Sequence, residues 1–64
     1  MNSQSLQDWL QLRLRVMDLE AGLATLALQV AEGAEPAARL SAQQQVVEAT
    51  RETCIAAFAR AFPT

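Results

Sequence analysis

Few side chains in this sequence could do covalent chemistry, and Cys54 is the most nucleophilic of them. A cysteine nucleophile needs a neighbouring base or cation that favours the thiolate, and the chain contains neither histidine nor lysine. Without histidine, no Ser–His, Cys–His or Glu-x-x-His arrangement can form, and no glycine-rich phosphate loop is present. We therefore interpret Cys54 as a buried, inert apolar side chain, and we expect a protein that is not an enzyme.

The acidic residues of the second half also suggest no site. Glu48 and Glu52 lie one helical turn apart with Arg51 between them, which is typical of a solvated helix face. A single cysteine without histidine offers neither a disulfide within the chain nor a metal site. We expect no catalytic residue, no cofactor, no metal and no small-molecule substrate.

Charge and composition narrow the function classes further. Five arginines face seven acidic residues, so the net charge is −2 and no basic surface for nucleic acid is expected. The chain is 52% hydrophobic but contains only two glycines and two prolines, a profile that predicts an all-α protein.

Apolar residues in the first half follow two rows with helical spacing, which predicts one long helix with two apolar faces. The first row comprises Trp9, Leu12, Val16, Leu19, Leu23, Leu26 and Val30. The second row comprises Leu10, Leu14, Met17, Ala21, Ala24, Leu28 and Ala31. One neighbouring helix covers only one of these rows, and the sequence leaves open which row faces inward.

A narrow polar strip follows the same predicted helix. It comprises Asp8, Gln11, Arg15, Asp18, Gly22, Thr25, Gln29 and Glu32. Helices that lie in a membrane surface carry lysine and arginine on their polar face, whereas acids predominate on this strip. The longest apolar stretch, 21–31, is far shorter than the roughly 20 residues that span a bilayer. We expect no membrane association.

Capping signals predict two helices and a short turn. Ser5 to Asp8 has the form of a capping box, so the first helix is expected over about 5–32, with Gly22 permitting a close backbone approach. Gly33 suits the left-handed position after a helix, and Pro36 suits the first turn of the next. The turn is expected at about 33–35 and the second helix at about 36–61. Short links make neighbouring helices antiparallel, so an antiparallel hairpin is predicted.

The second helix offers one line of residues to the first helix and leaves others over. The line comprises Leu40, Val47, Cys54, Phe58 and Ala61, and Ile55 and Phe62 fall outside it. Trp9 has two interpretations: it anchors an interface, or it packs the open end of the hairpin against Phe58 or Phe62.

A chain of 64 residues seldom gains enough net stability from its own core, so we expect it to complete its core by association. A different protein chain is the favoured partner, and a homodimeric four-helix bundle is the alternative. The partner-binding candidates are Trp9, Leu10, Leu14, Met17, Leu28, Ile55, Phe58 and Phe62. No positive residue precedes an apolar run at the N-terminus, so no secretory signal is visible and a cytoplasmic location is expected.

Several features are shared with known helical hairpins. The turn 33–36, the run Gln43-Gln44-Gln45 and the apolar end around 54–58 resemble the needle-subunit co-chaperones of bacterial type III secretion systems. That resemblance implies a cytoplasmic protein that, with a tetratricopeptide-type chaperone, keeps a self-assembling needle subunit soluble. The architecture is also similar to Rop, the plasmid RNA modulator, which dimerises into a four-helix bundle. Acids around Arg13 and Arg15 argue against the RNA function of Rop.

Overall fold

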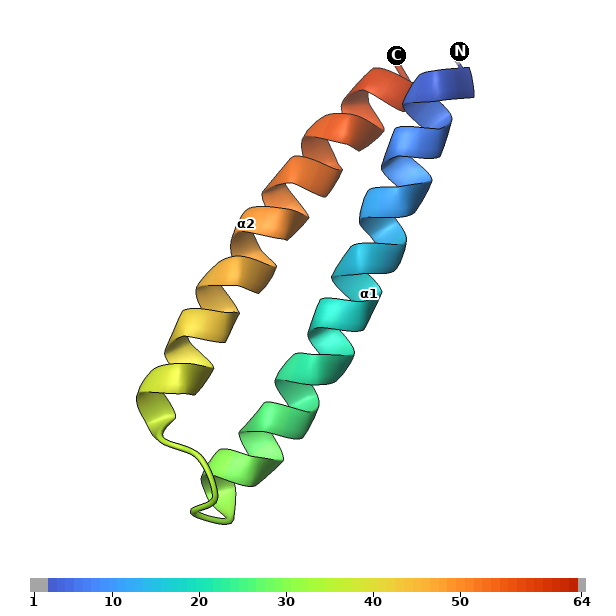
Figure 1. Ribbon diagram of the computed structural model, residues 1–64. Coiled ribbons are helices and arrows are strands. Elements are labelled where there is room, and N and C mark those ends of the chain that lie inside the picture. Colours follow the sequence, from blue (N-terminus) through green and yellow to red (C-terminus); the bar gives the residue numbers. More distant parts are fainter. Residues whose placement is uncertain (1–2, 64) are drawn as a thin grey trace.

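Two long antiparallel helices lie side by side in the computed structural model, which describes residues 3–63 (Figure 1). Helix α1 spans Ser3–Ala31 and helix α2 spans Ala37–Ala61. The principal extents are 47 × 14 × 14 Å, so the hairpin is long and narrow. Both termini lie at the same end, which we call the open end. The predicted all-α antiparallel hairpin is confirmed.

The first row of α1 faces α2. Val16 and Leu26 are buried, and the other five members of this row are half-buried. Every member of the second row is exposed. The question that the sequence left open is therefore answered: α1 turns the first row inward and leaves the second row to solvent.

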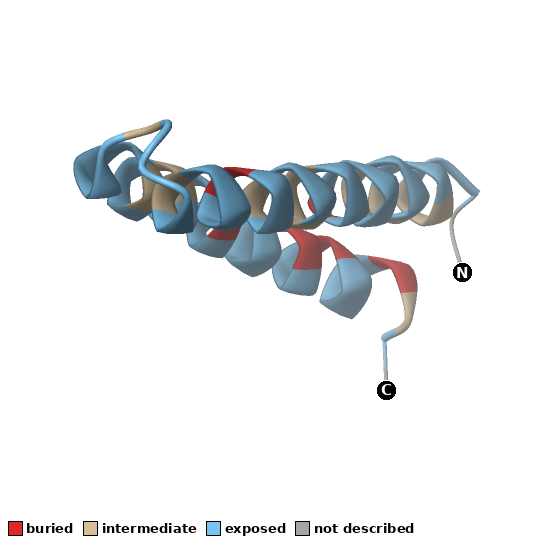
Figure 2. Ribbon diagram, turned by 90° about the horizontal axis from the view of Figure 1, so that it is seen from below, coloured by how far each residue is buried: buried red, intermediate tan, exposed pale blue. Residues whose placement is uncertain are grey.

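Helix α2 contributes small residues to the contact, on its side toward α1 (Figure 2). Val47, Cys54 and Ala61 are buried and Leu40 is half-buried, as predicted. Ala57 is also buried, although it was not predicted. Ala57 lies three residues after Cys54 and four before Ala61, on the same face of the helix, and its small side chain lets the helices approach closely.

The turn between the helices follows the expected glycine geometry. Gly33 has φ of 80°, in the left-handed region. Its N–H donates to the Val30 carbonyl at 3.0 Å, and the Ala34 N–H donates to the Gln29 carbonyl at 2.8 Å. These two bonds form a Schellman motif, which satisfies carbonyls that the end of α1 would leave unpaired.

Both predicted helix starts differ from the structure. Ser5 is not the N-cap, because α1 already includes Ser3, and the Asp8 carboxylate accepts a hydrogen bond from the Gln4 side chain at 2.9 Å. Helix α2 begins at Ala37, so Pro36 lies one residue outside the first turn, with extended φ and ψ of −73° and 147°. Its carbonyl accepts from the Arg39 N–H at 3.1 Å. Proline fits this capping position because its φ is already fixed near that value.

Gly22 does not mark a close backbone approach. A Cβ atom built at this position meets nothing within 4 Å, and the residue is exposed on the polar strip. The expected role is wrong because Gly22 lies on the side of α1 that faces solvent rather than α2.

Three aromatic rings close the open end. The Trp9 ring meets the Phe58 ring at 5.6 Å and the Phe62 ring at 5.3 Å between centroids, both edge-to-face. Phe58 and Phe62 lie 4.7 Å apart. Edge-to-face pairs add roughly 0.5–1.5 kcal/mol each beyond their buried area. Packing of Trp9 within the hairpin, one of its two interpretations, is therefore observed.

The two glycines make a matched test of backbone conformation. Gly33→Ala should lower the free energy of unfolding by about 1 kcal/mol, because alanine is strained at positive φ. Gly22→Ala should raise it by about 0.5–1 kcal/mol, because alanine favours a helix interior and the site has free space. Urea denaturation followed by circular dichroism measures both. Equal effects of the two changes would contradict the assigned turn.

The aromatic cluster is tested by truncating its central ring. Trp9→Ala should lower the free energy of unfolding by about 2 kcal/mol, since a half-buried ring and two ring contacts are lost. Trp9→Phe keeps a ring and should lose less than half as much. Thermal and urea melts of both variants give the comparison. A melt of Trp9→Ala that matches the unmodified chain would show that the open end is held by other contacts.

Candidate protein-binding surface

The exposed second row is the largest apolar feature of α1. Its large side chains are Leu10, Leu14, Met17 and Leu28, which are 45–64% exposed. Soluble monomers seldom expose contiguous apolar patches larger than a few hundred Å². This row therefore marks a surface that another molecule could cover.

Helix α2 adds exposed apolar side chains of its own. Ile55 is 69% exposed, Phe58 is 47% exposed and Val46 is 46% exposed. Ile55 was expected to remain outside the contact with α1, and its exposure agrees with that prediction. Phe58 was expected to face α1, and it does so through the Trp9 ring while leaving nearly half of its surface in solvent.

Most of the exposed apolar side chains lie in one half of the hairpin. The half that contains the termini carries Leu10, Leu14, Ile55 and Phe58, and Met17 lies at the midpoint of α1. We call these five residues the open-end patch. Among the described residues, the half near the turn exposes only Leu28 and Val46 as large apolar side chains. The surface is therefore asymmetric along the length of the molecule.

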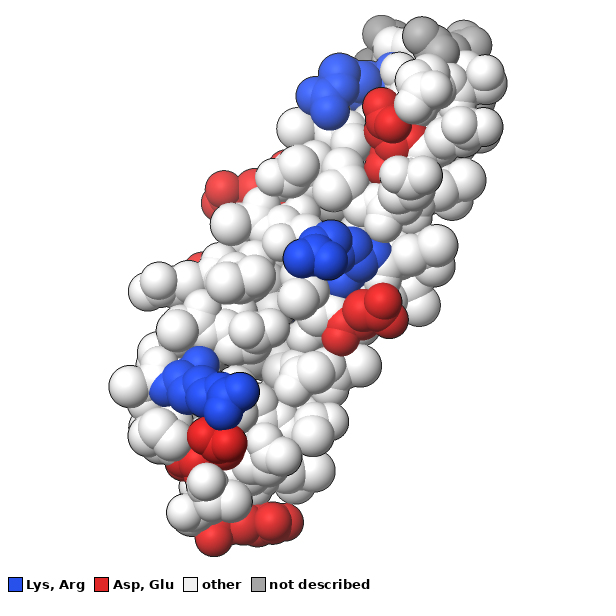
Figure 3. Space-filling view, viewed as in Figure 1, with Lys and Arg blue, Asp and Glu red and all other residues white. Residues whose placement is uncertain are grey.

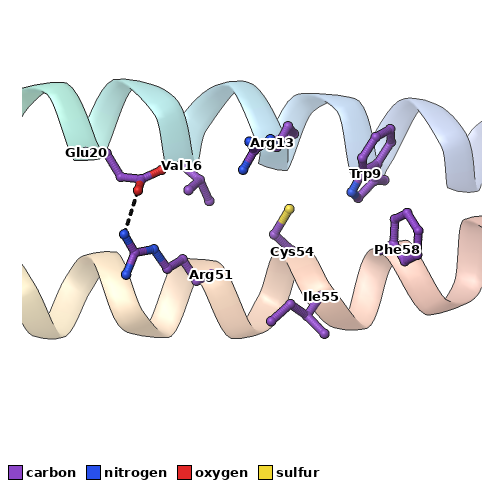
Figure 4. Close-up of a pocket in the computed structure, with 8 residues that line it drawn as sticks. All are labelled: Trp9, Arg13, Val16, Glu20, Arg51, Cys54, Ile55 and Phe58. Carbon is purple, nitrogen blue, oxygen red and sulfur yellow. Dashed lines mark hydrogen bonds and ion pairs between the residues drawn. The ribbon is translucent and has the colours of Figure 1, made fainter.

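A groove of about 370 Å³ lies between the helices within this half (Figure 4). Helix α1 lines it with Trp9, Arg13, Val16 and Glu20, and helix α2 lines it with Arg51, Cys54, Ile55 and Phe58. Val16 and Cys54 are buried and form its floor, and the Cys54 sulfur points toward α1. The groove offers apolar burial at its base and charged groups at its sides.

Electrostatic contacts cross the groove at one point. Arg51 donates to the Glu20 carboxylate, and their side chains are 50% and 39% exposed. An ion pair so exposed contributes roughly 0–1 kcal/mol. Arg13 forms no ion pair with any residue that the structure describes. The groove thus carries two guanidinium groups and one carboxylate, a local positive excess in a chain of net charge −2.

The opposite side of α1 is polar. All eight members of the polar strip are exposed, as expected. On the face drawn in Figure 3, basic and acidic groups lie in small separate clusters with uncharged surface between them. That face therefore presents no continuous field of one sign.

The side chains that were considered for chemistry lie in different environments. Cys54 is free and buried, as expected for an inert small apolar side chain. Glu48 and Glu52 are exposed. Across residues 3–63, no group of three or more histidine, cysteine, aspartate or glutamate side chains could hold a metal ion.

The structure separates the predicted partner-binding residues into two sets. Trp9, Phe58 and Phe62 contact one another inside the hairpin, and Phe62 is half-buried. Five others lie exposed outside that cluster: Leu10, Leu14, Met17, Leu28 and Ile55. Leu28 stands apart from the rest, toward the turn.

The charged sides of the groove and one exposed apolar residue were not predicted from the sequence. Arg13 and Glu20 lie between the two rows of α1, and this position indicates that they border the inward contact. The spacing alone did not predict which residue of α2 pairs with Glu20. Val46 directly precedes the buried Val47 but falls outside the predicted inward line of the second helix, so its exposure follows from the spacing although it was not named as a candidate.

Neither helix, within the residues described, is long and apolar enough to cross a membrane. No family model matches this chain, and no curated protein or solved structure matches it either.

Proposed function

We propose that this protein is a binding module that completes its helical core with another protein chain. The observation that supports this proposal best is the state of the second row on α1, whose seven members are all exposed. The hairpin is fully folded along its length and still leaves these side chains without a neighbour. A partner helix packed there would remove them from water.

The accessible surface gives a second argument. The chain exposes 4643 Å², whereas a folded monomer of its mass is expected to expose about 4,000 Å². The excess of roughly 600 Å² approaches the roughly 800 Å² per partner that a standard protein interface buries. Association with another chain would bring the exposed surface to the ordinary value.

The mechanism is burial of helix faces. The open-end patch provides large apolar side chains, and Arg13 provides a cation that can pair with a partner's carboxylate. Large apolar contacts stabilise such a complex, and the charged sides of the groove select the register of the partner.

A more specific form of this proposal is a chaperone or adaptor subunit. The resemblance to type III secretion needle co-chaperones suggests a cytoplasmic role in which this chain keeps a self-assembling subunit soluble. The exposed row suits that role, because a chaperone must offer an apolar surface to a client that would otherwise aggregate.

The partner can be identified and the face tested with one design. A photo-reactive amino acid at Leu14 should crosslink the partner in the source cells, and mass spectrometry identifies it. The double variant Leu14→Glu and Met17→Glu should then weaken binding of the purified partner at least a hundredfold in calorimetry, because each change places a charge in an apolar contact.

The polar strip provides the control. Arg15→Gln removes a charge at the edge of the strip beside Leu12 and Thr53, away from the second row, and should leave partner binding within about twofold of the unmodified chain. Circular dichroism of the double variant should retain the helical signal, since both changed residues are exposed. Unchanged binding by the double variant would refute the choice of face, and crosslinks only between copies of this chain would refute a different protein as partner.

A further inference from the structure

We propose that, when no other protein is bound, a second copy of this chain covers the same face in a parallel two-fold dimer, with both open ends together. The inference rests on the face that the proposed function uses. It specifies which molecule covers the face and in which orientation. The second copy shields the apolar face from water, and a partner protein must displace this copy before it can bind. The two-fold axis runs along the length of the hairpins.

The asymmetry of the patch along the hairpin selects the parallel orientation. Full antiparallel overlap would place each open-end patch against the turn half of the other copy, where α2 carries Ser41 and Gln43 to Gln45. Parallel overlap places patch against patch. Apolar surface is then removed from water on both sides of the interface, which is what stabilises association.

The register of the parallel dimer follows from contacts within one chain. The Trp9–Phe58 ring pair and the Glu20–Arg51 ion pair fix which residues of α1 and α2 lie at the same height. The two-fold axis is parallel to the helices, and each α1 lies beside the α2 of the other copy. Rotation about this axis leaves the position of a residue along the hairpin unchanged, so residues at the same distance from the open end meet. Leu10 and Met17 of one copy then lie at the height of Phe58 and Ile55 of the other.

Charge distinguishes this dimer from a staggered antiparallel one. In that alternative, the two hairpins run in opposite directions and only their open ends overlap. The two-fold axis is then perpendicular to the helices and passes between Leu10 and Met17, so Arg13 meets Arg13 of the second copy. Like charges in contact oppose association. In the parallel dimer, Glu20 of each copy lies at the height of Arg51 of the other, so the two ion pairs combine into an alternating network.

The area available suits a dimer of this size. Two chains that each bury an excess of roughly 600 Å² form an interface of about 1,200 Å² in total, at the lower bound for specific interfaces. A contact of this size is exchangeable, as a resting form that gives way to a partner must be. The dimer is therefore expected to dissociate on dilution.

The orientation is tested by a distance between turns. Ala34→Cys in a Cys54→Ala background places one nitroxide label on each turn, and the full chain is used. Light scattering should give twice the 7.0 kDa chain mass at high concentration. Electron–electron resonance should give a label separation below about 30 Å, since neighbouring helix axes lie about 10 Å apart. A separation near the 47 Å hairpin length or longer, or a monomer at every concentration, would overturn the proposal.

Two substitutions on different sides of the hairpin test the interface itself. Met17→Glu should raise the dimer dissociation constant by about 10- to 100-fold, because one large apolar side chain leaves the contact. Thr53→Glu changes an exposed residue of α2 that lies beside Leu12 and Arg15, away from the second row, and should leave the dissociation constant within about twofold. Equal effects of the two changes would also overturn the dimer. A monomer that still crosslinks a different protein at Leu14 would reject this inference alone and leave the proposed function standing.

Discussion

A two-helix hairpin can bury only one stripe of each helix, and this limit determines most of what the structure shows. Helix α1 has apolar residues on two sides, but α2 covers one of them. The choice between the rows follows from their side chains. Three of the seven members of the second row are alanines, whereas the first row has none, so turning the first row inward buries more apolar area.

The inward contact is closed at its two ends by different means. At the turn, the left-handed Gly33 and the Schellman hydrogen bonds stop α1 and send the chain back. At the open end, Trp9 reaches across to two phenylalanines. Between them Val16, Leu26 and Val47 are buried, and the small side chains of Cys54 and Ala57 let the backbones approach closely. The hairpin is thus well defined in shape, and large side chains such as Leu14 and Leu28 still remain outside it.

The sequence predicted the helices, the turn and the members of both rows, because these depend on spacing and on local capping. It did not predict which row turns inward, since that depends on the area each row buries against α2. The start of α1 was misplaced because Ser5 has the residue types of a cap, whereas the helix already includes Ser3. The groove could be anticipated only in part: Arg13 and Glu20 were visible beside the inward row, but the ion pair with Arg51 depends on the register between the helices.

If this protein is a binding module, the second row of α1 is covered when it acts. Met17 reports on this directly, because its side chain is 52% exposed in the isolated hairpin and its sulfur oxidises at a rate that depends on access. The measurement is the rate at which hydrogen peroxide converts Met17 to the sulfoxide, by peptide mass spectrometry, in dilute purified chain and in source cells. We expect oxidation near the rate of free methionine in the dilute chain and protection of at least tenfold in cells. Equal rates in both settings would contradict this expectation.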